Sequence, residues 1–255
     1  MLSFVLILAS LTGCGRREAK SEKEEPALQA SVQPSEPVPD ASLEKTPQST
    51  SQQSIQEAGA EPENGISIDK AIGVLNGTTY TNELFGFTME IPEGWFFASK
   101  DDLVMINQLG ADFVKQSSGN ESMIDLAMQK VLPLFFTSRY SLTQQSQTNA
   151  NINCIAENIG LAGSLVQNGK DYITLASQAI KAQGLDYAFG EIKETKIGKA
   201  DFAYADGVLK MNGMEIKQTM YVTLKDKFSL VMTLTHFSDE DKNQLEDIIK
   251  SVSFK

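Results

Sequence analysis

Few side chains in this sequence could carry chemistry of their own. The 255-residue chain has two cysteines, Cys14 and Cys154, and one histidine, His236. Nucleophilic catalysis needs a base beside the nucleophile, and a histidine-based metal site needs several imidazoles. Cys154 and His236 are far apart in sequence, and simpler interpretations are a small buried residue in a strand and a residue at a strand end. We therefore expect no catalytic residues, no metal site and no cofactor.

Acidic residues cluster at two places, and neither pattern is typical of a ligand site. The pair at 101–102 is predicted to lie in a solvated turn. The run at 239–241 follows Ser238 at the predicted start of a helix, where the helix dipole stabilises carboxylates. Neither run has calcium-loop spacing, and the glycine-bearing stretch 160–169 lacks the Lys-Ser/Thr ending of a phosphate-binding loop.

The surroundings of Cys14 indicate a lipid attachment site. Residues 2–11 are almost all apolar, a length of about half a membrane span that suits the apolar region of an export signal. Leu11-Thr12-Gly13-Cys14 follows and resembles the lipobox of bacterial lipoproteins. The resemblance implies that the Cys14 thiol receives a diacylglycerol and that the chain is cut before Cys14. Two or more acyl chains anchor a protein stably. The alternative is a chance cysteine after an ordinary signal peptide.

Residues 15–64 have the composition of a disordered tether. Such a segment cannot bury enough apolar surface to offset its ordering entropy. A flexible chain of this length would place a domain roughly 40 Å from its anchor. A proline-rich partner motif is the alternative. The segment has no aromatic residue and holds six of the eight prolines: Pro26, Pro34, Pro37, Pro39, Pro47 and Pro62.

Three parts are therefore expected: a signal peptide at 1–13, a tether at 14–64 and one folded domain at 65–255. The sequence predicts a protein that is lipid-anchored on the extracytoplasmic face of a cell membrane. The formal net charge is −11 and nothing resembles a basic stripe. This charge argues against nucleic acid as a partner and against electrostatic binding to anionic lipid.

The first half of the domain shows both strand and helix patterns. Alternating apolar residues predict a strand over 80–91, and Pro92 and Gly94 suit a type I turn over 91–94. We expect the next strand at 103–109. A helix is predicted over 120–132, ended by Pro133.

The second half shows clearer patterns. A strand containing Cys154 is expected at 151–159 and a helix at 169–183. Asn212-Gly213 predicts a hairpin, followed by two long strands with one buried face around the turn 225–227. Ser238 begins the last helix, and 251–254 is a final short strand. The expected fold class is α+β, an antiparallel sheet with helices on its faces.

A family resemblance accompanies this pattern. The run from Tyr80 to Trp95, Y-T-N-E-L-F-G-F-T-M-E-I-P-E-G-W, resembles the opening hairpin of the PsbP-like superfamily and its bacterial lipoprotein relatives. The closing run 214–254 is also similar to those chains. The resemblance implies an α-β-α sandwich. It also implies an accessory or binding role, because most members have one, and it assigns no functional residue.

The candidate binding residues are aromatic residues and one arginine. Trp95 is either a plug at the rim of the core or, together with Phe96, an exposed binding anchor. Arg139 and Tyr140 could line a groove. We expect a non-catalytic accessory module that binds a protein partner in the cell envelope, supported by an exposed apolar patch. A carrier or sensor of a small ligand would instead need a concave pocket, and an enzyme would need a site around Cys154 or His236.

Overall fold

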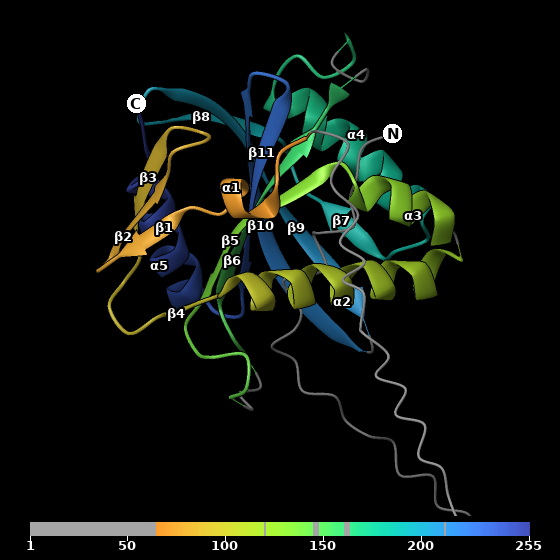
Figure 1. The fold of residues 1–255 in the computed structure, drawn as a ribbon. Helices are drawn as coiled ribbons and strands as arrows, with labels where there is room; N and C mark the ends of the chain where they lie inside the picture. Colours follow the sequence, from red (N-terminus) through yellow and green to blue (C-terminus); the bar gives the residue numbers. More distant parts are fainter. Residues whose placement is uncertain (1–64, 120, 145–147, 161–163, 212) are drawn as a thin grey trace, which may run out of the picture. The chain divides into compact units, whose positions relative to one another are not determined.

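The structure is a computed structural model that describes residues 65–119, 121–144, 148–160, 164–211 and 213–255 (Figure 1). The predicted signal peptide, Cys14 and the predicted tether lie outside these residues. The helices are α1 (Ile68–Ala71), α2 (Lys100–Ser118), α3 (Glu121–Met128), α4 (Gly169–Ala182) and α5 (Asp239–Lys250). The strands are β1 (Val74–Asn76), β2 (Thr79–Asn82), β3 (Phe87–Glu90), β4 (Phe96–Phe97), β5 (Val131–Ser138), β6 (Asn151–Asn158), β7 (Tyr187–Phe189), β8 (Lys193–Ile197), β9 (Ala200–Met211), β10 (Met214–Lys225), β11 (Phe228–His236) and β12 (Ser253–Phe254).

The strands form two antiparallel sheets. The main sheet has the order β4-β5-β6-β11-β10-β9-β7, and β8 also pairs with β9. The small sheet has the order β1-β2-β3-β12, so the last strand of the domain pairs with β3 near its beginning. The two ends of the domain are thereby joined by strand pairing.

Helices cover both faces of the main sheet (Figure 1). On one face, Leu245 and Ile248 of α5 and the aromatic residues of the small sheet pack in one core with even-numbered residues of β11 such as Leu230. On the other face, α2 and α4 pack in a second core that includes Val231 of β11. The predicted α+β class, with helices on both faces of an antiparallel sheet, is confirmed.

Helix α2 replaces the strand predicted at 103–109. Its buried residues recur at the helical spacing, because Leu103, Ile106 and Val114 point inward while Val104 and Met105 are about half exposed. Ser99 caps the helix. Its hydroxyl accepts from the Asp102 amide (3.2 Å), and the Asp102 carboxylate accepts from the Ser99 amide (2.9 Å). The acidic pair at 101–102 is thus the first turn of a helix rather than a solvated loop.

Two further boundaries differ from the prediction. The run 80–91 is a hairpin, because Gly86 takes a positive φ of 67° and separates β2 from β3. Helix α3 ends at Met128, before Pro133, which lies inside β5 where the register with β6 shifts. A bulge tolerates a residue without an N–H group.

The second half follows the prediction closely. Strand β6, helix α4, the β9–β10 hairpin, the turn at Asp226, the Ser238 cap and β12 all lie where expected. Asn212 itself is outside the described residues. One expectation is wrong: all of β11 and residues 218–223 of β10 are buried on both faces, so only the ends of β10 have residues exposed to solvent. Helix α5 and the small sheet cover the second face.

Candidate functional site

A groove of about 660 Å³ lies between the small sheet and α5 and is open to solvent. Two of the predicted binding residues, Trp95 and Arg139, line it, although they come from opposite ends of a segment that contains all of α2 and α3. We call this feature the Trp95 groove. Its lining residues are Thr78, Glu90, Ile91, Pro92, Glu93, Trp95, Arg139, Gln244, Asp247, Ile248 and Ser251.

One wall of the groove is the end of β3 and the turn that follows it. Pro92 accepts a hydrogen bond from the Trp95 amide (3.2 Å), and Gly94 has a φ of 81°. A positive φ at the third residue is typical of a type II turn over 92–95 rather than the predicted type I turn over 91–94. The turn places Trp95 half-buried against the core between the sheets, with the rest of the ring in the groove.

The other wall is the second half of α5. Ser251, directly after the helix, joins the two walls, because its hydroxyl accepts from the Glu90 amide (2.9 Å) and donates to the Ile248 carbonyl (2.6 Å). Ile248 is buried, so its side chain anchors α5 in the core beneath the groove. The two walls are therefore held at a fixed separation by a backbone-to-side-chain link.

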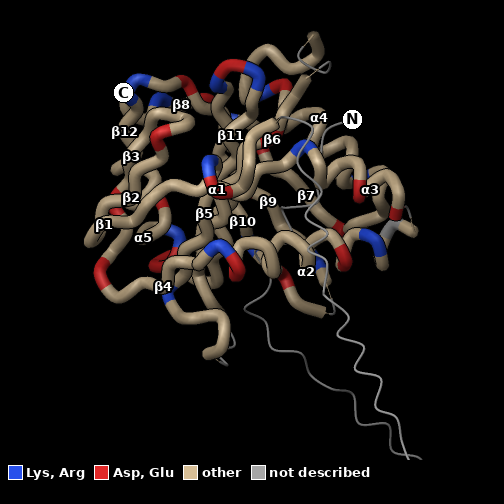
Figure 2. The backbone as a smooth tube through the Cα atoms, in the orientation of Figure 1, with Lys and Arg blue, Asp and Glu red and all other residues tan. Residues whose placement is uncertain are grey.

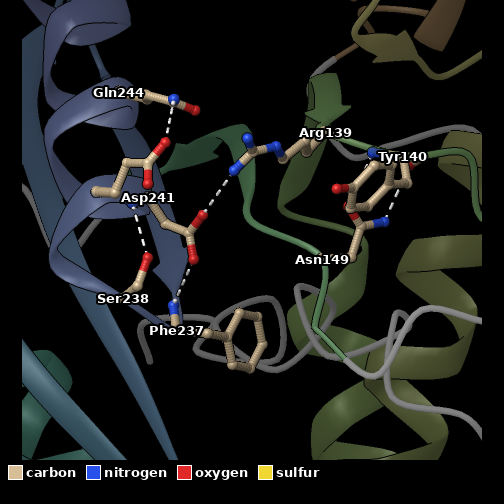
Figure 3. A network of polar contacts seen from close by, with 8 residues as sticks. Arg139, Tyr140, Asn149, Phe237, Ser238, Asp241 and Gln244 are labelled. Atoms are coloured by element: carbon tan, nitrogen blue, oxygen red, sulfur yellow. Dashed lines mark hydrogen bonds and ion pairs between the residues drawn. The ribbon is translucent and has the colours of Figure 1, made fainter.

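Arg139 lines the groove directly after β5 and pairs with Asp241 in the first turn of α5 (Figure 3). Its guanidinium donates to Asp241 Oδ1 (3.2 Å), while Asp241 Oδ2 accepts from the Phe237 amide (3.3 Å). Gln244, which also lines the groove, donates to Glu240 one turn earlier on α5. The charge of Arg139 is thereby neutralised within the protein.

The other two predicted binding residues are outside the groove lining. Phe96 is in β4 and packs against the core on the α2 side of the main sheet, so it points away from Trp95. Tyr140 is 37% exposed and lies beside the Arg139 guanidinium, with 6.0 Å between the guanidinium carbon and the ring centre. Its backbone is fixed by Asn149, which accepts from the Tyr140 amide and donates to the Tyr140 carbonyl. Tyr140 is therefore a neighbour of the lining residue Arg139 and not part of the lining itself.

The α5 wall and Glu90 were not among the predicted site residues. Glu90 and Ser251 are 161 positions apart, and their contact depends on the pairing of β12 with β3. No local pattern announces that pairing. The available signal was the strand predicted at 251–254. A strand must pair with another strand, but the sequence does not indicate which one.

Cys154 and His236 do not form a joint site. Cys154 is fully buried in β6, and burial raises the pKa of its thiol. It pairs with Met232, four positions before His236 on β11, which corresponds to about 13 Å along the strand. Among the described residues, no group of three or more His, Cys, Asp or Glu side chains is placed to hold a metal ion.

His236 is nevertheless expected to control acid stability. Burial lowers its pKa below the ordinary value of 6.5; Lys242 and Lys217 lower it further, and Asp206 and Asp241 oppose them. Neither ring nitrogen has a hydrogen-bond partner in the described part of the chain. Folding favours the neutral imidazole. The contribution of His236 to the free energy of unfolding is therefore fully present above pH 6.5 and is lost as the pH falls through the folded-state pKa.

The expected result is a free energy of unfolding that declines as the pH falls below about 6.5, with a shallower decline in His236→Gln. Denaturant unfolding of both proteins at several pH values measures it. Since the chain has one histidine, NMR titration of that imidazole checks the cause directly. Equal slopes in the two proteins would contradict the assignment.

Charges on the domain are mixed. Figure 2 shows Lys and Arg interspersed with Asp and Glu over the described backbone. In the groove lining, acidic residues outnumber basic ones: Glu90, Glu93 and Asp247 against Arg139 alone. Arg139 is already paired with Asp241. Asp247 is paired with Lys250 (2.8 Å). The uncompensated charge of the groove therefore comes from Glu90 and Glu93.

The chain is similar in fold to several solved structures, although no protein-family model and no curated protein matches it. The solution structure of cyanobacterial PsbP from Synechocystis sp. PCC 6803 has a TM-score of 0.45 and 12% identity, over 72% of this chain and 96% of that one. The structure of LpqN, involved in cell envelope biogenesis of Mycobacterium tuberculosis, has a TM-score of 0.36 and 13% identity, over 66% and 83%. At this level the similarity concerns the fold alone.

Proposed function

We propose that this chain is a lipid-anchored extracytoplasmic protein that acts as a non-catalytic binding module for a protein partner in the cell envelope. Cys14 is the proposed point of lipid attachment, residues 15–64 are the tether, and the Trp95 groove is the docking site. No helix in the described residues is long and apolar enough to cross a membrane.

The observation that carries the proposal is the composition of the groove. Pro92 and the half-buried Trp95 present apolar surface in the groove, Ile91 and Ile248 lie buried behind them, and the other lining residues are polar or charged. Buried aromatic anchors with a polar rim are the usual energetic centre of a protein interface. The groove also lies between two elements, β3 and α5, that are fixed to each other, so it is formed before the partner arrives.

A small-ligand carrier is the second candidate, favoured by the volume of the groove. About 660 Å³ is within the range of small-molecule sites. Such sites, however, bury most of their ligand, whereas this groove is open to solvent. An extended segment of a partner protein fits an open groove better than a carried molecule does.

The test is site-specific cross-linking in cells that produce the full chain. A photoreactive phenylalanine analogue replaces Gln244, which lines the groove, or Asn243, its exposed neighbour on α5 that does not. We expect Gln244 to cross-link to one envelope protein and Asn243 to give no product. Trp95→Ala should abolish the product, with circular dichroism confirming that this variant folds. Equal products from both positions, or a product that survives Trp95→Ala, would exclude the groove.

A further inference from the structure

We infer that the Trp95 groove recognises an extended segment that presents a lysine or arginine beside an apolar residue. This inference rests on the proposed binding function and names the chemistry of the occupant. The charge and the fixed geometry of the β3 wall support it.

Glu90 is the side chain that indicates a positively charged ligand. Its carboxylate accepts from the Thr79 hydroxyl at Oε1 (2.8 Å) and from the Thr78 hydroxyl at Oε2 (3.1 Å). The two hydroxyls hold the carboxylate in one orientation without neutralising it. A carboxylate that is already ordered loses little conformational entropy when a cation binds to it.

In the part of the chain that the structure describes, neither Glu90 nor Glu93 forms an ion pair with a lysine, arginine or histidine. The other charges of the groove are balanced: Arg139 is paired with Asp241, and Asp247 with Lys250. The negative charge of the β3 wall is thus available to a ligand. An ammonium or guanidinium group would complement it and would form charge-assisted hydrogen bonds.

Trp95 and Pro92 indicate that the bound segment has an apolar residue next to its lysine or arginine. They share the β3 wall with Glu90 and Glu93 and are the more exposed apolar residues of the lining, since Ile91 and Ile248 are buried. The aliphatic part of a lysine or arginine could cover the indole ring while its charged end reaches Glu90. The next side chain would then lie against the exposed ring of Pro92, which a polar group could cover only at a desolvation cost. An acidic segment would meet repulsion on the same wall.

Selection from displayed random dodecapeptides on the full chain tests this specificity. Because Trp95 is the only tryptophan, the fluorescence of each selected peptide's complex reports directly whether the groove is occupied. The charge variant is Glu90→Gln/Glu93→Gln. The matched control, Glu191→Gln/Glu194→Gln, removes the same charge from exposed positions in and just before β8.

We expect the selected peptides to contain lysine or arginine next to an apolar residue and to change the Trp95 emission. Their affinity should fall about tenfold or more in Glu90→Gln/Glu93→Gln and less than about twofold in the control. Peptides that alter Trp95 emission but lack basic residues, or that bind the charge variant equally well, would overturn the inference and leave the binding function standing. If no selected peptide alters Trp95 emission, both fail.

Discussion

Phe135→Ala is expected to lower the free energy of unfolding by about 3–5 kcal/mol. Phe135 is fully buried in β5 on the face that meets the small sheet, and its ring centre is 4.8 Å from that of Tyr80 in β2. Phe97 stacks on it from β4 at 6.3 Å. Removing the ring opens a cavity between the two sheets, so the packing of β2 and β4 against β5 weakens. Chemical denaturation measures the loss.

Phe136→Ala is the matched control, because Phe136 is equally buried but packs on the other face, toward α2 and α4. Both variants should lose comparable stability. Only Phe135→Ala should shift the native-state emission of Trp95, since Trp95 packs against the core that contains Phe135. A Trp95 shift in both variants, or in neither, would contradict the division of the core into two faces.

Gly169→Ala is expected to destabilise the domain by about 1–3 kcal/mol. In most helices, by contrast, replacing glycine with alanine stabilises the helix. Gly169 is the first residue of α4 and lies against β9 and β10. An added Cβ would be 2.4 Å from the Val222 carbonyl oxygen and 3.1 Å from the Ala203 Cβ. Both partners belong to the central sheet, so α4 itself has to move away.

Lys170→Ala is the control for this change, since Lys170 is the next residue of the same helical turn and is exposed. Its free energy of unfolding should stay within about 0.5 kcal/mol of the parent protein. Thermal denaturation of the two variants side by side makes the comparison. A stabilised Gly169→Ala would show that α4 does not approach the sheet as closely as described.

The accuracy of the sequence predictions depended on how local the determining interactions are. The β9–β10 hairpin and the Ser238-capped helix were predictable, because a tight turn and a cap are determined by neighbouring residues. Helix α2 was missed because four consecutive apolar residues, 103–106, suit a buried strand as well as a helix. The Ser99–Asp102 capping box was the signal that should have decided between them.

The candidate site was only partly predictable for the same reason. Trp95 and Arg139 were identified by residue type, which indicates what a side chain can do but not what lies beside it. Phe96 does not line the groove with them, because consecutive residues of an extended chain point to opposite faces and Phe96 packs on the α2 side. Glu90 and Ser251 were missed because their contact depends on two strands from opposite ends of the domain.

The most direct test of the central claim is hydrogen–deuterium exchange of the full chain, alone and bound to the partner segment that cross-links at Gln244. We expect slower exchange in both groove walls, residues 90–95 and 244–251, and unchanged exchange in α4. Protection in α4 or elsewhere, with both walls unchanged, would show that the Trp95 groove is not where the partner binds.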